Sequence, residues 1–109
     1  MGLRNDMSKY SPKKITYQEL EKLWGQFVRV LVALRTEDNV KRFLKDLMNR
    51  QERLMFVRRL LIAKYLADGW SYEQIQKKLG VGRTTIARVQ RWLEFGREGY
   101  KRAIKRLRV

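Results

Sequence analysis

A glycine-marked turn between two short helix-forming stretches, within residues 71–93, constrains the fold more than any other feature of the chain. Ser71 can cap the first stretch through its hydroxyl, and Gln74, three residues on, can accept a hydrogen bond from the N–H of the cap. Apolar residues then recur at helical spacing, and Gly80 can adopt the left-handed conformation that ends a helix. Gly82 lets a second helix begin at once. The stretch therefore predicts a helix-turn-helix.

The second helix of this motif has two unlike faces. At about 100° per residue, Ile86, Val89 and Leu93 share one apolar face. The opposite face has small and cationic side chains: Thr84, Ala87, Arg88 and Arg91. Small residues allow close approach to a DNA groove, and arginine can bond guanine edges or phosphates. The pattern is typical of a helix that enters the major groove. An ordinary helical hairpin with a solvated basic face is the alternative.

We expect DNA contacts from both helices of the motif. On the second helix the candidates are Arg83, Thr84, Thr85, Arg88 and Arg91. On the first helix the candidates are Ser71, Lys77 and Lys78, which we expect to hold phosphates. Phosphate contacts position a protein on the duplex, whereas contacts with base edges select the sequence.

The composition favours a polyanionic partner. The 109 residues include 26 Lys and Arg against 11 Asp and Glu, a formal net charge of +15. Such an excess repels itself in the folded state unless a polyanion neutralises it, and double-stranded DNA is the partner we expect. An anionic membrane surface is the alternative. We expect no membrane partner, because no single helix has the arginine-rich polar face of an interfacial anchor.

The residue types that the chain lacks exclude several kinds of chemistry. There is no Cys and no His, which removes disulfides, thiol nucleophiles, imidazole bases and the usual zinc ligands. We therefore expect no catalytic site, no metal and no cofactor. The N-terminus shows neither the apolar core of a signal peptide nor a membrane-spanning segment, so we expect a cytoplasmic protein.

The whole chain predicts an all-α fold of about six helices, with no strand signal. Residues 1–14 are polar and basic and include the only proline, so we expect a mobile tail before a single domain, residues 15–109. A basic tail can follow a DNA backbone, although a charged terminus is more often merely solvated.

Three polar residues mark helix starts ahead of the motif: Thr16, Thr36 and Asn49. Thr16 and Asn49 are each followed three residues later by a glutamate, the spacing of a capping box. The helix after Asn49, roughly residues 50–67, is apolar around nearly its whole circumference, which predicts a central, buried helix. After the motif, a last helix is expected from about Glu98.

The first two helices pose a difficulty for a single chain. Both add a broad apolar stripe to a central helix that is already apolar all round, whereas a chain of this length buries a limited part of its surface. A second copy of the chain would cover the surplus. We therefore predict a homodimer whose interface includes Leu20, Trp24, Phe27, Leu31 and Phe43.

These residues resemble a family, the Trp-repressor-like proteins, and more closely their YerC/YecD-type branch. The similarity covers roughly residues 38–107. Its most specific parts are four segments: Gln-Glu-Arg at 51–53, Leu-Ala-Asp-Gly-Trp-Ser at 66–71, Leu-Gly-Val-Gly at 79–82 and Thr-Ile-Ala-Arg at 85–88.

The resemblance implies an intertwined all-α homodimer, with interleaved N-terminal helices and two projecting helix-turn-helix heads. It also implies sequence-specific binding of double-stranded DNA in transcriptional control, and we expect a repressor. The Trp repressor is itself among the proteins from which this docking geometry is known, so the geometry adds no independent support.

The resemblance also raises the question of an effector. In tryptophan-sensing members of the family two arginines sandwich the indole ring, and Arg58 and Arg88 are their counterparts here. The sensing proteins have a glycine and a serine where this chain has Val89 and Trp92. These larger side chains should leave little room for a ligand. We therefore predict DNA binding that does not depend on L-tryptophan, with no small-molecule corepressor and Arg58 and Arg88 as packing and phosphate residues.

Two other functions use similar helices. A DNA-targeting module of a transposase or recombinase is disfavoured, because the chain has only 11 acidic residues and no carboxylate cluster for a two-metal site. A second alternative is a sequence-indifferent nucleic-acid-coating protein or a sigma-type module held by a polymerase. It would differ from a regulator in its preference for a specific site over bulk DNA. Only a true regulator binds its own site much more tightly than bulk DNA.

Overall fold

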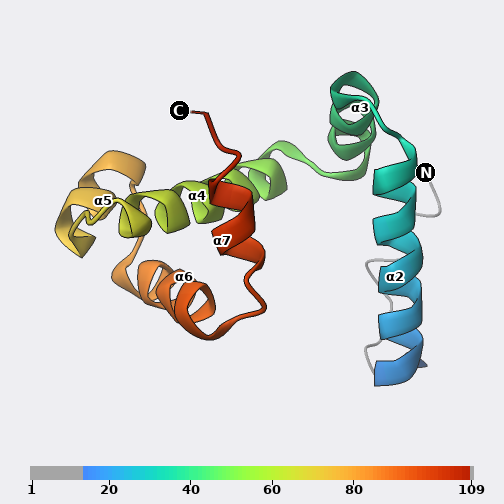
Figure 1. Ribbon diagram of the computed structural model, residues 1–109, viewed down its shortest axis with the longest axis horizontal. Helices are drawn as coiled ribbons and strands as arrows, with labels where there is room; N and C mark the ends of the chain where they lie inside the picture. Colours follow the sequence, from blue (N-terminus) through green and yellow to red (C-terminus); the bar gives the residue numbers. More distant parts are fainter. Residues whose placement is uncertain (1–13, 109) are drawn as a thin grey trace. The chain divides into compact units, whose positions relative to one another are not determined.

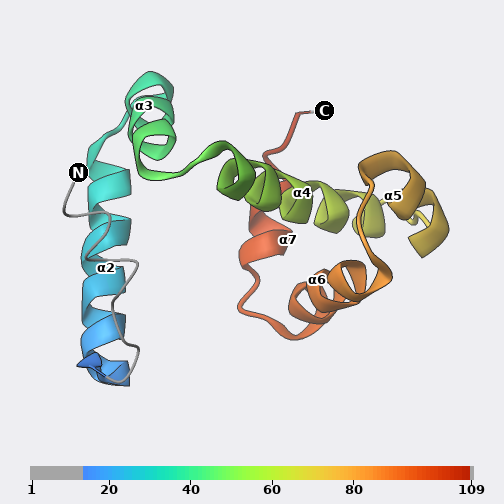
Figure 2. The ribbon, with the colours of Figure 1, turned by 180° about the vertical axis from the view of Figure 1, so that it is seen from behind.

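The computed structural model describes residues 14–108 and is entirely helical in its regular elements over that range (Figure 1; Figure 2). The elements are α2 (Tyr17–Ala33), α3 (Glu37–Leu47), α4 (Arg50–Ala67), α5 (Tyr72–Leu79), α6 (Arg83–Phe95) and α7 (Gly99–Ile104). The prediction of an all-α fold with about six helices is confirmed. The predicted mobile tail, residues 1–14, lies outside the described residues except for Lys14, which is exposed.

The chain divides into two compact units, Met1–Leu44 and Lys45–Val109. The first contains α2 and most of α3, and the second contains α4 to α7.

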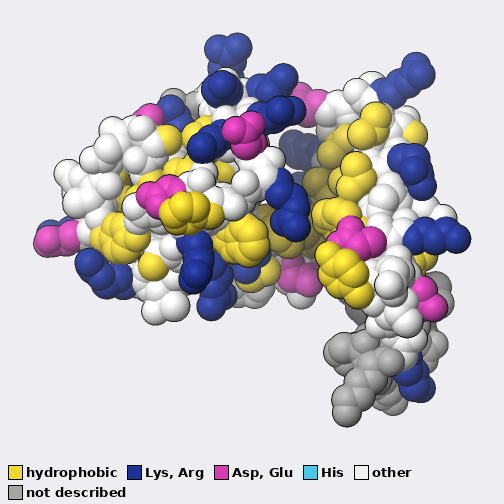
Figure 3. Space-filling model, turned by 60° about the horizontal axis from the view of Figure 1, so that its bottom comes forward, with side chains coloured by type: hydrophobic (Ala, Val, Ile, Leu, Met, Phe, Trp, Pro, Cys, Tyr) yellow, Lys and Arg dark blue, Asp and Glu magenta, His cyan; other side chains and the backbone are white. Residues whose placement is uncertain are grey.

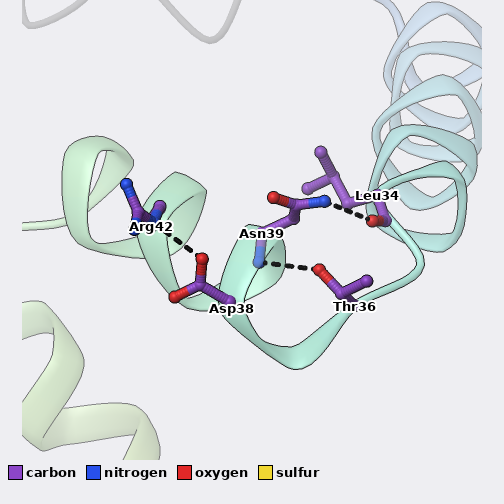
Figure 4. Close-up of polar contacts among 5 residues, drawn as sticks. All are labelled: Leu34, Thr36, Asp38, Asn39 and Arg42. Carbon is purple, nitrogen blue, oxygen red and sulfur yellow. Dashed lines mark hydrogen bonds and ion pairs between the residues drawn. The ribbon is translucent and has the colours of Figure 1, made fainter.

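In the first unit, local hydrogen bonds fix where both helices begin. The Glu19 N–H donates to Thr16 Oγ1 at 3.1 Å, and the Thr16 N–H donates back to the Glu19 carboxylate at 3.4 Å, which confirms this capping box. The Asn39 N–H donates to Thr36 Oγ1 at 3.1 Å, as expected for a cap at the start of α3 (Figure 4).

The link between α2 and α3 is also held by side chains (Figure 4). The Asn39 amide nitrogen donates to the Leu34 carbonyl at 3.1 Å, and the same carbonyl accepts from the Thr36 N–H at 2.7 Å, so two donors satisfy a carbonyl at the end of α2. The Arg42 guanidinium pairs with Asp38 at 2.9 Å one turn along α3. Both contacts are exposed, so each contributes little to stability.

The apolar side chains of the first unit are only partly covered. Trp24, Phe27 and Phe43 form a chain of ring contacts, with centroids 5.4 and 6.2 Å apart. Neither α2 nor α3 contains a buried residue. Leu20 and Trp24 remain 53% and 57% exposed, so the apolar stripe of α2 has no covering element within its own unit.

The second unit has a small, complete core. Its fully buried side chains come from three helices: Ile62 and Ala63 of α4, Ile75 of α5, and Ile86 and Val89 of α6. Tyr65 stacks on Trp70 with centroids 4.1 Å apart, which holds the turn after α4 against that helix. Tyr100 and Ile104 of α7 pack against the same core. This core sets α6 at a fixed position on α4.

The prediction that α4 is a buried helix is wrong for the first half of the helix. Asn49 and Glu52 form the predicted capping box, with both hydrogen bonds at 2.9 Å, and the second half of the helix is central to the unit. The first half exposes four large apolar side chains, Leu54, Met55, Phe56 and Val57, by 38% to 52%. No helix within the single unit packs over them, so an apolar sequence alone does not bury them.

Candidate nucleic-acid interface

The start of α5 is fixed by the predicted capping box. The Gln74 N–H donates to Ser71 Oγ at 3.2 Å, and the Ser71 N–H donates to Gln74 Oε1 at 2.9 Å. Ile75 is buried, while Tyr72 and Leu79 pack against the core from the same face of the helix. Ser71 itself stays exposed, so its hydroxyl is accessible from solvent as well as bonded to the helix.

The turn between α5 and α6 depends on one left-handed residue. Gly80 has φ 65° and ψ 38°, and its N–H donates to the Gln76 carbonyl at 2.9 Å. Val81 packs against the core beneath the turn, and Gly82 follows in an extended conformation. The two helices and the turn that the sequence predicted are thus present.

The start of α6 differs from the starts of α2, α4 and α5. Gly82 has no side chain to cap the helix, and the first turn of α6 contains no acidic residue. The positive end of the helix dipole therefore faces solvent without a carboxylate near it in sequence. Arg83, the first residue of the helix, is exposed there.

The outward face of α6 agrees with the pattern in the sequence. Ile86 and Val89 are buried and Leu93 is half-buried, which fixes the orientation of the helix on the core. All of the predicted DNA-contact residues are exposed: Ser71, Lys77, Lys78, Arg83, Thr84, Thr85, Arg88 and Arg91. Their side chains are therefore available to a partner.

The surface of the second unit is strongly basic. Residues 45–109 contain 17 Lys and Arg against 6 Asp and Glu. Lys and Arg side chains are spread over the face seen in Figure 3, with apolar side chains between them. One predicted phosphate contact, Lys77, lies 3.5 Å from Glu73, but both side chains are more than three-quarters exposed, so the pair is weak and Lys77 can leave it.

The structure adds contacts that the sequence analysis missed. The Arg83 guanidinium lies over the Tyr72 ring, 4.8 Å from its centroid. The Tyr72 hydroxyl hydrogen-bonds Gln90, and the Gln90 amide nitrogen donates to Glu94 at 3.0 Å. Gln90 follows Arg83 by seven residues, which is close to two helical turns. This spacing in the sequence indicates that both residues lie on one side of α6.

A cleft of about 610 Å³ lies in the second unit, beside the start of α6. Its walls include Arg58 and Arg59 of α4 and Arg88, Val89 and Trp92 of α6. Val89 is 3% exposed and belongs to the core, whereas Trp92 is 51% exposed. The cleft is open in the single chain and the Trp92 indole is about half exposed, so the expectation that Val89 and Trp92 leave little room for a ligand stays a prediction.

Comparison with known proteins places this arrangement in a family. The sequence model of the family described as "Trp repressor protein" matches residues 22–108. The chain belongs to the Trp repressor family. The matched segment includes all eight residues of the candidate interface and the three arginines of the cleft, Arg58, Arg59 and Arg88.

Individual relatives of the Trp repressor family support the assignment. The uncharacterized protein YerC of Bacillus subtilis is 30% identical over 95 residues, which cover 87% of this chain and 88% of YerC. The crystal structure of a TrpR-like protein from Eubacterium eligens superposes with a TM-score of 0.69 at 31% identity, over 86% of this chain and 93% of that one. A candidate Trp repressor from Staphylococcus aureus gives a TM-score of 0.68 at 26% identity, over 90% and 94% of the two chains.

Among residues 14–108, no group of three or more His, Cys, Asp or Glu side chains could hold a metal ion. In the same part of the chain, every helix is too short or too polar to cross a membrane.

Substitution of Gly80 tests the left-handed turn. We expect Gly80→Ala to lower the free energy of unfolding by about 1–2 kcal/mol, because a Cβ atom is strained at positive φ. Gly80→Asn is the matched control and should cost less, since asparagine tolerates this conformation. Chemical denaturation of the three proteins measures the difference. Equal losses for Ala and Asn would contradict a strained backbone as the cause.

Proposed function

We propose that this protein is a sequence-specific double-stranded DNA-binding transcriptional regulator that acts as a homodimer, and that it is a repressor. The observation that supports this most directly is the division of α6. The helix buries Ile86 and Val89 and exposes residues that suit a DNA groove: Arg83, Thr84, Thr85, Arg88 and Arg91. Membership of the Trp repressor family and the basic surface of the second unit agree with it.

The two helices would divide the work of binding. On α6, the small threonines permit close approach to base edges, and the arginines supply forked donors that match guanine or phosphate. The uncapped, acid-free start of α6 favours a nearby phosphate. On α5, Ser71, Lys77 and Lys78 would hold the backbone and so fix the register of α6 in the groove.

A sequence-indifferent coating protein is the second candidate, because the charge alone would support it. The formal net charge of +15 is sufficient for tight binding to any duplex at low salt. A regulator differs by typically 10³- to 10⁷-fold tighter binding to its own site than to other DNA. Selection of bound sequences from a pool of random duplexes, followed by affinity measurements at physiological salt, separates the two.

Two substitutions should separate the base-reading residues from the phosphate-holding residues. We expect Arg88→Ala to cost about 1–3 kcal/mol on the selected duplex and to relax the preference at one base position. Lys77→Ala should weaken binding to selected and random duplexes alike. It should also reduce by about one the slope of the logarithm of the binding constant against the logarithm of the salt concentration. Titrations on both duplexes at several salt concentrations measure this. Identical behaviour of the two variants on both duplexes would overturn the assignment.

The dimer is proposed from exposed apolar side chains in both units. In α2, Leu20 and Trp24 are more than half exposed, and in α4 the same holds for Val57. Two chains whose helices interleave would cover these surfaces. Such a dimer would also agree with the prediction of a single domain, residues 15–109. The predicted interface residues are Leu20, Trp24, Phe27, Leu31 and Phe43. A two-fold axis would place the two α6 helices about 34 Å apart, in successive major grooves.

Sedimentation tests the dimer directly. We expect a stable dimer at micromolar concentration, and Trp24→Glu should disrupt it, because a carboxylate would be buried in the interface without a partner. Lys22→Glu is the control, since residue 22 lies on the opposite face of α2 and is exposed. A wild-type monomer, or equal effects of the two substitutions, would contradict the proposal.

DNA binding without tryptophan is proposed from the walls of the cleft. Arg58 and Arg88, the counterparts of the ring-holding arginines, both line it, but so do Val89 and Trp92. The cleft is open in the single chain, so the argument rests on Trp92. Its half-exposed indole borders the same space and could occupy it in place of a free indole.

Calorimetric titration with L-tryptophan tests this expectation. We expect no binding at micromolar ligand and an affinity for the selected duplex that is unchanged when tryptophan is added. Trp92→Ser is the informative variant, because it removes the side chain that we expect to compete with a ligand. Micromolar binding by the wild type, or DNA binding only with tryptophan present, would contradict the proposal.

A further inference from the structure

Tyr72 contacts α6 at two places that lie two turns apart. Its ring lies under the Arg83 guanidinium at 4.8 Å, and its hydroxyl hydrogen-bonds Gln90. The ring itself is half-buried and packs against the core of the second unit. The core therefore holds Tyr72 on one side, and on the other side the ring contacts Arg83, a residue that we expect to bind DNA.

Arg83 occupies a position that is unfavourable for a cation. It is the first residue of α6, where the positive end of the helix dipole repels a guanidinium, and the first turn of that helix contains no carboxylate to offset the charge. Among the described contacts of Arg83, the face of the Tyr72 ring is the one that attracts a cation. The ring therefore favours the orientation in which the exposed Arg83 guanidinium lies over it.

We propose that Tyr72 is a positioning residue that holds Arg83 at the start of α6 in the orientation used for DNA. Its hydroxyl bond to Gln90 fixes the plane of the ring along α6, and the ring then fixes the guanidinium. Less side-chain entropy is lost when a pre-oriented arginine binds, so Tyr72 raises DNA affinity without touching DNA. This inference rests on the proposed DNA-binding function.

A double-substitution experiment tests whether Tyr72 acts through Arg83. Affinities are measured for the wild type, Tyr72→Leu, Arg83→Gln and the double variant, on the duplex selected from the random pool and on a 30-base-pair random duplex. We expect Tyr72→Leu to lower affinity about two- to fivefold, as for loss of an exposed cation–π contact. In the Arg83→Gln background, Tyr72→Leu should change affinity less than about 1.5-fold, because the arginine through which Tyr72 acts is absent.

Three controls exclude a general loss of structure. Tyr72→Phe keeps the ring that contacts Arg83 but not the hydroxyl bond to Gln90, so it should lose less affinity than Tyr72→Leu. Arg91→Gln replaces an α6 arginine that makes no ring contact among the described residues, and its effect should add to that of Tyr72→Leu. Thermal unfolding of every variant shows whether an affinity change follows from destabilisation.

The outcomes separate this inference from the proposed function. Equal fold losses from Tyr72→Leu with and without Arg83 would overturn the positioning role while DNA binding stands. If the wild type binds both duplexes equally, sequence specificity fails, but the coupling is still measured on the random duplex. Absence of binding to either duplex would overturn both.

Discussion

The packing of α6 against α4 is the contact on which the rest of the second unit depends. Ile86 and Val89 are buried together with Ile62 and Ala63, and one face of α6 is fixed inward by that contact. Because a helix repeats about every 3.6 residues, fixing the inward face also fixes the outward face, where Arg88 and the threonines lie. Loss of this apolar contact would release the arginines from any defined geometry.

The same core is small and leaves much apolar surface uncovered. Only five side chains are buried in residues 14–108, while four apolar residues in the first half of α4 and the stripe of α2 stay exposed. A core of this size provides little stability for a chain of this length. Burial of the exposed stripes against a second chain would add apolar area at about 25 cal/mol per Å², so folding and assembly should be closely coupled.

The sequence predicted best what depends on neighbouring residues. The capping boxes at Thr16, Asn49 and Ser71 and the left-handed Gly80 were read correctly, because each depends on residues no more than four positions apart. The exposure of the first half of α4 was missed, because periodicity shows that a residue is apolar and not whether another helix covers it. The contact of Tyr72 with Arg83 was missed for a related reason: it joins two helices across the turn.

The cleft shows the limit of arguing from side-chain volume alone. Valine and tryptophan in place of smaller residues predict a filled space only if both side chains point into it. Val89 instead belongs to the core, at 3% exposure, and forms part of the cleft wall without filling the cleft, while Trp92 is half exposed and borders it. A large residue fills a cavity only when packing holds it there. The indole of Trp92 has several rotamers available at the surface, so the volume beside Arg58 and Arg88 depends on which one it adopts.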